Sequence, residues 1–160
     1  MTDGKPYRPN VGIALFNASG QVLIGRRFRD DGPEIILPGL EWQMPQGGID
    51  ADENPRDAVM RELWEETGIV GASHLGETDW LSYEFPRYDG PPHRLAKFRG
   101  QRQKWFALRF TGQDGDIDLT AHEPEFSDFQ WVSLEALPGL IVPFKRQTYK
   151  AVIAAFQNLA

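Results

Sequence analysis

The stretch from Gly47 to Ile69 reads GGIDADENPRDAVMRELWEETGI, and it decides the fold. A glycine pair leads into a segment in which Glu62, Glu65 and Glu66 are spaced three and four residues apart. At about 100° per residue, these three carboxylates share one face of a helix. Like charges at this spacing repel one another, so we expect a ligand that offsets the repulsion. Carboxylate clusters are how proteins bind hard divalent cations such as Mg²⁺ or Mn²⁺.

The residues at both ends of this segment predict where the helix begins and ends. Asn54 is a good N-cap, and Pro55 suits the first helical position because its missing N–H needs no partner there. Gly68 can adopt the left-handed conformation that ends many helices. We therefore predict a helix from Pro55 to the residue before Gly68. A separate apolar face, suited to packing on a core, is formed by Val59, Met60, Leu63 and Trp64.

The rest of the chain predicts short strands and a second long helix. Strand-like runs at 11–16 and 22–27 flank a turn-rich tetrapeptide, which indicates a hairpin. Residues 28–41 contain two prolines and two glycines and are predicted to be a loop. The other predicted elements are strands at 42–44, 79–85, 104–111 and 126–132, a short helix at 134–137 and an amphipathic helix at 144–159. This pattern predicts an α/β (or α+β) fold with a mixed β-sheet sandwiched between helices.

Length and composition narrow the class of protein. With 160 residues and 41% hydrophobic content, residues 1–160 are expected to form a single domain. The chain lacks cysteine, a signal-peptide-like N-terminus and any apolar run of about 18 residues. We therefore expect a soluble cytoplasmic protein with no membrane contact, and nothing in the sequence implies an obligate protein partner. The net charge of −6 argues against non-specific coating of nucleic acid.

Two further features suggest a phosphate-rich, base-containing ligand. Residues 93–106, HRLAKFRGQRQKWF, hold five Lys or Arg residues and no acidic residue. Such a local concentration of cations favours a polyanionic ligand, although a solvated loop has the same composition. Aromatic residues near cations could stack a nucleobase, although each is more often a core residue, except that for Phe144 the two interpretations weigh equally. These aromatic candidates are Tyr83, Trp105, Phe144 and Tyr149.

The quoted stretch satisfies the signature G-x5-E-x7-R-E-U-x-E-E-x-G-U, with U a bulky aliphatic residue, and so resembles the Nudix hydrolase family. The matching residues are Gly47, Glu53, Arg61, Glu62, Leu63, Glu65, Glu66, Gly68 and Ile69. Other segments resemble the Nudix branch that contains bacterial RNA 5′-pyrophosphohydrolases and the asymmetrical dinucleoside tetraphosphate hydrolases of bacteria and plants. These segments are 7–12 (YRPNVG), 42–48 (WQMPQGG), 100–106 (GQRQKWF), 124–126 (PEF) and 144–146 (FKR). Residues 29–40 are longer than the matching segment of some RNA pyrophosphohydrolases.

This resemblance implies the Nudix fold and a role for several residues. The implied cofactor is two to three Mg²⁺ (or Mn²⁺) ions. Their ligands would be Glu62, Glu65, Glu66, Glu125 and the backbone at Gly47. Arg61 would orient a glutamate, and Glu53 would brace the junction of loop and helix. The catalytic set is thus Glu62, Glu65, Glu66, Glu125 and Arg61, and the substrate-binding set is Arg8, Tyr83, Lys104, Phe144 and Lys145.

The function implied is metal-dependent hydrolysis of phosphoanhydride bonds in nucleoside polyphosphates. The substrate would be a 5′-triphosphorylated RNA end that loses pyrophosphate, a diadenosine polyphosphate that is cleaved asymmetrically, or both. Two alternatives remain open, namely a mononucleotide house-cleaning pyrophosphatase and a non-catalytic nucleotide or RNA sensor on a Nudix scaffold. His74, His93 and His122 have no metal-ligand spacing, so no role is predicted for them.

Overall fold

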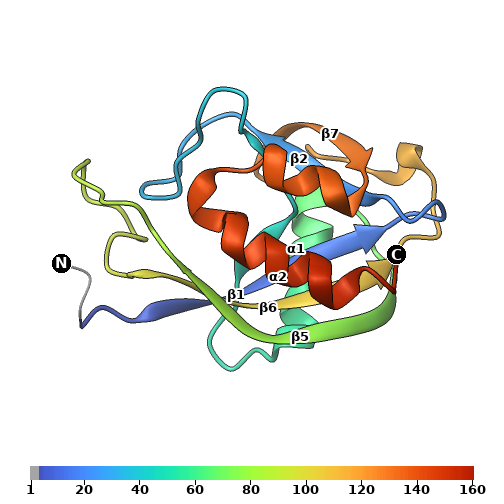
Figure 1. Ribbon diagram of the computed structural model, residues 1–160, viewed down its shortest axis with the longest axis horizontal. Coiled ribbons are helices and arrows are strands. Elements are labelled where there is room, and N and C mark those ends of the chain that lie inside the picture. The colour runs from blue at the N-terminus through green and yellow to red at the C-terminus, as the bar shows by residue number, and fades with distance from the viewer. Residues whose placement is uncertain (1–3) are drawn as a thin grey trace.

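The computed structural model describes residues 4–160, and its central element is one mixed sheet (Figure 1). The strands are β1 (Tyr7–Phe16), β2 (Val22–Arg27), β3 (Trp42–Gln43), β4 (Gln46–Gly48), β5 (Ser73–Glu84), β6 (Gly100–Arg109) and β7 (Phe126–Val132). The two α-helices are α1 (Pro55–Thr67) and α2 (Arg146–Phe156). Short 3₁₀ turns are η1 (Asp114–Asp116), η2 (Leu134–Gly139) and η3 (Pro143–Lys145). None of the helices within residues 4–160 has both the length and the apolar character needed to span a membrane.

Strand β1 is the hub of the sheet. The main order is β3-β2-β1-β6-β5, with β4 paired to β1 and β7 paired to β2. The pairing of β1 with β6 is parallel, and all the other pairings are antiparallel. Phe16 faces Val22 across β1 and β2, which confirms the predicted hairpin. The glycine-containing β4 and the basic β6 are thereby brought to the same central strand.

The sheet separates two apolar layers, each covered by one helix. Successive side chains of a strand point to opposite faces, and β1 is buried on both sides. Ile13 and Leu15 pack in the cluster that contains Leu63 of α1, whereas Ala14 and Phe16 pack in the cluster under α2. In Figure 1, α2 crosses in front of the sheet and α1 lies behind it. The predicted sandwich of a mixed sheet between helices is confirmed.

Helix α1 begins and ends where its sequence predicts. The Asn54 side chain accepts a hydrogen bond from the Asp57 backbone N–H at 2.9 Å, and Gly68 has a φ of 73°. Leu63 is fully buried, but Trp64 is 44% exposed. The Trp64 ring lies edge-on to His122, with 3.9 Å between ring centroids. Trp64 therefore covers a loop at the protein surface, and the prediction that it packs in the core was wrong.

The largest differences from the predicted elements come from pairing between distant segments. Strand β5 begins six residues before the predicted run at 79–85, because residues 73–84 pair with β6. Strands β1 and β6 each begin four residues before their predicted runs, because residues 7–10 pair with residues 100–103. Strand β4 was not predicted, and it forms because Gln46–Gly48 pairs with Asn10–Gly12 of β1. The predicted final helix begins with the 3₁₀ turn η3 and becomes α-helical at Arg146.

Candidate active site

A pocket of about 410 Å³ lies where β1, β4 and α1 meet the loop of residues 28–41 and the segment before β7. It gathers side chains of both charges from distant parts of the chain. The acidic group consists of Glu62, Glu65, Glu66 and Glu125. The basic group consists of Arg8, Arg27, Arg94 and Lys145. This pocket, which we call the main pocket, thus offers carboxylate oxygens that can bind cations and, beside them, positive charges that can bind anions.

Arg61 ties the glycine strand to the helix and orients two members of the acidic group. Its guanidinium donates to both carboxylate oxygens of Glu53, at 2.9 and 2.8 Å, and to the Gly48 carbonyl at 2.8 Å. It also donates to Glu62 at 2.9 Å and to Glu65 at 3.1 Å. The hydrogen bonds from Arg61 lower the pKa of Glu53 to about 2. These are the contacts expected of an orienting arginine and a bracing glutamate.

The glycine pair is required by close contact. A Cβ atom built on Gly47 would lie 2.0 Å from Cδ of Glu62, and one built on Gly48 would lie 2.2 Å from Nη2 of Arg8. Both distances are far shorter than a van der Waals contact, so a side chain at either position would displace a pocket residue. The backbone of β4 therefore lies directly against one carboxylate and one cation of the pocket.

The acidic group is electrostatically unfavourable by itself. Burial raises the pKa of Glu62 to about 7, although Arg61 opposes this shift. Burial, together with the charges of Glu62 and Glu125, raises the pKa of Glu66 well above its ordinary value. Burial and the nearby Asp31 also raise the pKa of Glu125. A bound cation would relieve this mutual repulsion.

The chemistry of the acidic group fits a hard divalent cation. Glu66 has a buried carboxylate oxygen, Oε2, for which the described residues provide no hydrogen-bond partner. The group supplies only carboxylate oxygens, which Mg²⁺ and Mn²⁺ prefer to softer ligands. Within residues 4–160, no three acidic, histidine or cysteine side chains stand close enough together to hold a metal in their present positions. Cation binding would therefore have to draw these carboxylates together, and Glu66 is the member with an oxygen to spare.

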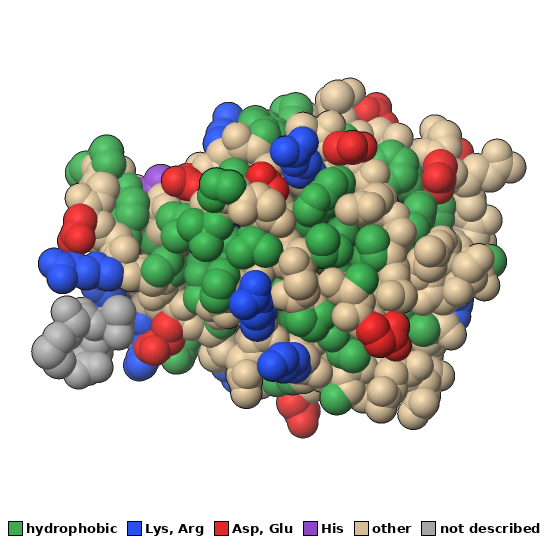
Figure 2. Space-filling model, turned by 45° about the horizontal axis from the view of Figure 1, so that its top comes forward, with side chains coloured by type: hydrophobic (Ala, Val, Ile, Leu, Met, Phe, Trp, Pro, Cys, Tyr) green, Lys and Arg blue, Asp and Glu red, His purple; other side chains and the backbone are tan. Residues whose placement is uncertain are grey.

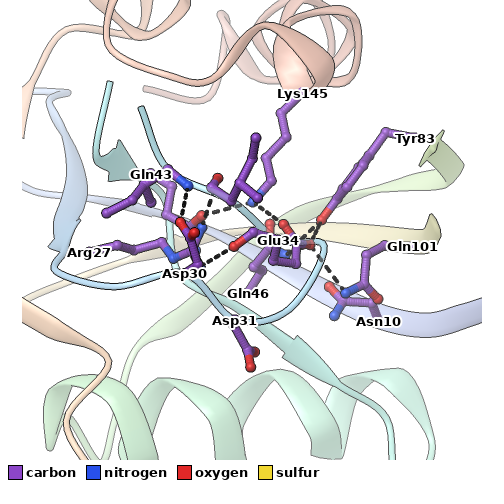
Figure 3. Close-up of polar contacts among 12 residues, drawn as sticks. Asn10, Arg27, Asp30, Asp31, Glu34, Gln43, Gln46, Tyr83, Gln101 and Lys145 are labelled. Carbon is purple, nitrogen blue, oxygen red and sulfur yellow. Dashed lines mark hydrogen bonds and ion pairs between the residues drawn. The ribbon is translucent and has the colours of Figure 1, made fainter. Parts of the chain in front are cut away.

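Glu34, a carboxylate outside the acidic group, reaches the main pocket from the 28–41 loop (Figure 3). Its Oε2 lies 2.9 Å from Nζ of Lys145, and its Oε1 accepts hydrogen bonds from the Tyr83 hydroxyl and from Gln101. Glu34 is 4% exposed and Lys145 is 1% exposed. Burial favours a raised pKa for Glu34, but the charge and hydrogen bond of Lys145, the Tyr83 hydrogen bond and the charge of Arg27 together outweigh burial, so the pKa is lowered. Arg27 also donates to the Glu34 carbonyl at 2.7 Å, which anchors the loop.

The structure brings four of the five predicted substrate-binding residues to the main pocket or next to it. Arg8 and Lys145 line the pocket, and the Lys145 ammonium also donates to Gln43 at 2.9 Å. Tyr83 and Phe144 pack together with ring centroids 5.8 Å apart, and both rings lie within 6 Å of the Lys145 ammonium. The other two aromatic candidates, which are Trp105 and Tyr149, are core residues.

Lys104 is the predicted substrate-binding residue that does not reach the main pocket. Its ammonium pairs with Glu77 at 3.0 Å. On β6, Gln101 lines the pocket and Gln103 bonds to Asn10 beside it. Because strand side chains alternate, Lys104 faces the opposite side of the sheet. Its placement does not fit the substrate-side role that the resemblance implied.

The basic segment of residues 93–106 does not form one cluster of cations. Its first part is a loop and its second part is β6, so its side chains point in several directions. Arg94 pairs with Asp31 at 2.8 Å, whereas Arg99 pairs with Glu84 on β5. Of the five cations in the segment, Arg94 lines the main pocket as the structure describes it. The cations of this segment therefore do not form the single phosphate-binding site that the sequence predicted.

Several pocket residues were missed by sequence reasoning. Glu34 and Asp31 lie in a segment that predicts only an irregular loop, so no sequence signal identifies them. Gln101 could have been found, because Gln101 and Gln103 repeat at the two-residue period of a strand. His122, which was given no role, lines the main pocket beside Trp64.

Comparisons with known proteins agree with this fold. The family model described as NUDIX domain matches residues 6–152. The RNA pyrophosphohydrolase of Azorhizobium caulinodans is 48% identical, over 97% of this chain and 95% of its own length. That of Gluconacetobacter diazotrophicus is 51% identical, over 100% of this chain and 98% of its own length. The crystal structure of the MutT protein from Methanosarcina mazei Go1 superposes with a TM-score of 0.70 at 22% identity, over 95% of this chain and 96% of that one, and so shares the fold.

Proposed function

The chain belongs to the Nudix family, and from this premise we propose that it removes pyrophosphate from the 5′ end of triphosphorylated RNA. Two relatives named RNA pyrophosphohydrolase, 48% and 51% identical over almost the whole chain, support the choice of substrate. The observation that carries the proposal is the main pocket, which brings the acidic group beside cations from other elements, among them Arg8 and Arg94. A polyphosphate needs both, because its charges must be matched while one phosphorus is attacked.

Nudix hydrolases generally use divalent metals such as Mg²⁺ or Mn²⁺. We propose that Glu62, Glu65, Glu66 and Glu125 hold two to three such ions here, with the Gly47 backbone close by. When bound, these ions would supply Lewis acidity, which would offset the negative charge of the phosphates and favour deprotonation of the attacking water. Arg61 keeps Glu62 and Glu65 on the pocket side of α1 through hydrogen bonds of 2.9 and 3.1 Å.

The residues of the chain then divide the remaining work. Glu125, or a glutamate of α1, accepts a proton from the water as the water oxygen attacks phosphorus. The anhydride P–O bond between the first and second phosphates breaks, so pyrophosphate leaves and a 5′-monophosphate remains. Arg8, held against Gly48 of β4, is placed to stabilise the negative charge on the departing pyrophosphate. Arg94, at the rim of the same pocket, can contact a further phosphate.

Other substrates are distinguished by what they would need from the same pocket. A diadenosine tetraphosphate would use the same acidic group but would place a second nucleoside where RNA continues. A mononucleotide would need fewer cations than the pocket provides. A non-catalytic sensor would have no need of the carboxylates, and all four line the pocket.

The proposal extends to the setting in which the enzyme works. We propose that residues 1–160 form one Nudix domain, which is supported by the family match over residues 6–152. Because the proposed substrate is the 5′ end of cellular RNA, we place the enzyme in the cytoplasm. The proposed reaction needs no second protein chain, since every group assigned to it comes from this one.

The test is side-by-side turnover, in Mg²⁺, of a 5′-triphosphorylated RNA, diadenosine tetraphosphate and a nucleoside triphosphate, with products identified. Release of pyrophosphate and a 5′-monophosphorylated RNA, faster than turnover of the other two, is the expected result. ATP plus AMP from the dinucleotide, with RNA left intact, would instead identify a dinucleotide hydrolase. Preferred turnover of the mononucleotide would identify a house-cleaning enzyme.

A further inference from the structure

A second pocket, of about 580 Å³, lies beside the main pocket and has a different lining. Its characteristic side chains are three aromatic rings and three cations. They are Phe85, Tyr88, Phe98, Lys5, Arg87 and Arg99. At the end of the molecule near the N-terminus, Figure 2 shows Lys and Arg side chains next to hydrophobic ones. None of the residues assigned to the reaction above belongs to this second pocket.

The two pockets lie on either side of one wall made by two loops. His93 and Arg94, from the loop between β5 and β6, both pair with Asp31 of the 28–41 loop, at 3.0 and 2.8 Å. In the first loop, Glu34 lines the main pocket and its neighbour Pro33 lines the second. In the loop between β5 and β6, Leu95 lines the main pocket and its neighbour Ala96 lines the second. A chain that leaves the main pocket over this wall would therefore enter the second pocket.

We propose that the second pocket binds the nucleotides that follow the first two of a single-stranded RNA whose 5′ end lies in the main pocket. This inference rests on the proposed function, and it adds a site that selects a polynucleotide over a dinucleotide. Single-stranded nucleic acid is bound by aromatic rings that stack bases beside cations that pair with phosphates. The lining of the second pocket has three Lys or Arg residues and one acidic residue, Asp89, in a chain of net charge −6. Its charge therefore complements the RNA backbone.

The aromatic rings are placed for stacking. Phe85 is 8% exposed and packs on Tyr83, with 6.2 Å between ring centroids, so it forms the floor. Tyr88 and Phe98 are half-buried, which leaves part of each ring accessible. The Tyr88 hydroxyl donates to the Pro91 carbonyl, which fixes the orientation of its ring. A fixed, partly exposed ring loses little entropy when a base stacks on it.

Arg87 is a cation of the second pocket that a phosphate group can reach. The Arg87 side chain is 88% exposed, and the side chain of Asp89, with which it forms an ion pair, is 74% exposed. Exposed pairs of this kind are worth little, so a phosphate can compete for the guanidinium. Arg94, whose side chain is 59% exposed at the wall, can contact the phosphate that crosses between the pockets. Cations thus line the path from one pocket to the other.

The test compares a 5′-triphosphorylated dinucleotide with a 5′-triphosphorylated octamer of the same leading sequence. We expect the wild type to show a lower KM for the octamer, on the order of tenfold for one or two stacked bases. Tyr88→Ala and Arg87→Ala should each reduce this preference several-fold and leave dinucleotide turnover unchanged. For Arg87→Ala, the slope of the logarithm of the octamer binding constant against the logarithm of the salt concentration should decrease in magnitude by about one. Lys150→Ala, which removes an exposed cation of α2, is the charge-matched control and should change nothing.

Two further measurements make the outcome decisive. Tyr88→Phe keeps the ring and should retain the octamer preference, which separates stacking from a change in folding. Anisotropy of a labelled 5′-hydroxyl octamer measures binding without any reaction. Octamer binding that depends on Tyr88, with no triphosphorylated RNA hydrolysed, would refute the proposed function and leave this inference standing. Equal KM values for both substrates, or an octamer preference that survives Tyr88→Ala and Arg87→Ala, would overturn it and leave a protein segment as the occupant to seek.

Discussion

Two carboxylates that face the same pocket have opposite electrostatic surroundings. Glu66 on α1 has a buried oxygen without a partner, and burial with two nearby glutamates raises its pKa well above the ordinary value. Glu34 is also buried, but Lys145, together with Tyr83 and Arg27, outweighs burial and lowers its pKa. Burial alone therefore does not decide the pKa of a buried acid, because the neighbouring charges and hydrogen bonds can strengthen or reverse its effect.

The difference indicates two kinds of task. Glu34 is neutralised inside the protein by Lys145, so it holds the 28–41 loop on the sheet and has no charge left for a ligand. The carboxylate of Glu66 lacks such a partner among the described residues, so it is free to bind a cation from solution. A buried acid with an internal partner supports structure, and one without a partner supports binding.

The largest effect should come from removing the unpartnered acid. Glu66→Gln keeps the shape of the side chain and removes a metal-binding, charged oxygen. We expect turnover of 5′-triphosphorylated RNA in Mg²⁺ to fall by about 10²–10⁴-fold, from loss of metal-assisted and base catalysis. The urea unfolding midpoint should stay the same or rise, because a repulsive charge is lost. Glu135→Gln, an exposed acid-to-amide change on η2, is the control. Turnover near that of the wild type would remove Glu66 from the site.

Breaking the internal pair should affect stability more than catalysis. Lys145→Met leaves Glu34 buried without its cation, and loss of one partner of a buried pair costs about 3–5 kcal/mol. Urea unfolding should show this loss. The double variant Glu34→Gln/Lys145→Met should regain most of it, since both charges are then absent. If the double variant is as unstable as Lys145→Met alone, the pair is not the cause.

The position of the glutamates on α1 could be predicted from the sequence, whereas the buried pair of Glu34 and Lys145 could not. Helix α1 carries its own start, stop and spacing signals, so Glu62, Glu65 and Glu66 could be placed on one face from local sequence alone. Gln101 and Glu34, which are joined by a side-chain hydrogen bond, lie 67 positions apart in the sequence. The 28–41 loop gives no periodicity from which a buried Glu34 could be inferred. The substrate-side role of Lys104 was taken from the resemblance, and neither the resemblance nor the basic run reveals which side chains of a strand share a face.

Metal binding should distinguish the two carboxylates thermodynamically. A ligand that binds only the folded state at 100 times its Kd stabilises a protein by about 2.7 kcal/mol. We therefore expect saturating Mg²⁺ to raise the melting temperature of the wild type by several degrees. Glu66→Gln should lose most of this shift, while the double variant at residues 34 and 145 should keep it. Equal shifts in all three proteins would mean that the cation binds elsewhere.

Arg61 differs from Lys145, because it orients carboxylates without fully neutralising them. Arg61→Lys keeps the charge but cannot reach Glu53, Glu62 and the Gly48 carbonyl together. Loss of such a supporting contact typically costs 10–100-fold in metal affinity or activity, so turnover should fall by about that factor. Raising the Mg²⁺ concentration should restore part of it. A variant with unchanged turnover and unchanged metal dependence would show that orientation by Arg61 is not needed.

The smallest effect concerns Glu53, whose pKa Arg61 lowers to about 2. A lowered pKa contributes stability that is present above the ordinary value of 4.5 and is lost as pH falls from there towards 2. The urea midpoint of the wild type should therefore drop more between pH 5 and pH 3 than that of Glu53→Gln. Identical drops would show that the Arg61 contact to Glu53 does not persist in solution.

The most direct test of the central claim is Mn²⁺ binding measured by electron paramagnetic resonance, which counts free ions and needs no substrate. It compares the wild type, Glu66→Gln and the double variant Glu34→Gln/Lys145→Met. We predict that the wild type and the double variant bind Mn²⁺ alike, and that Glu66→Gln loses at least one ion or binds it at least tenfold more weakly. Unchanged binding by Glu66→Gln, or loss of binding in the double variant, would contradict the division of tasks between the two buried carboxylates.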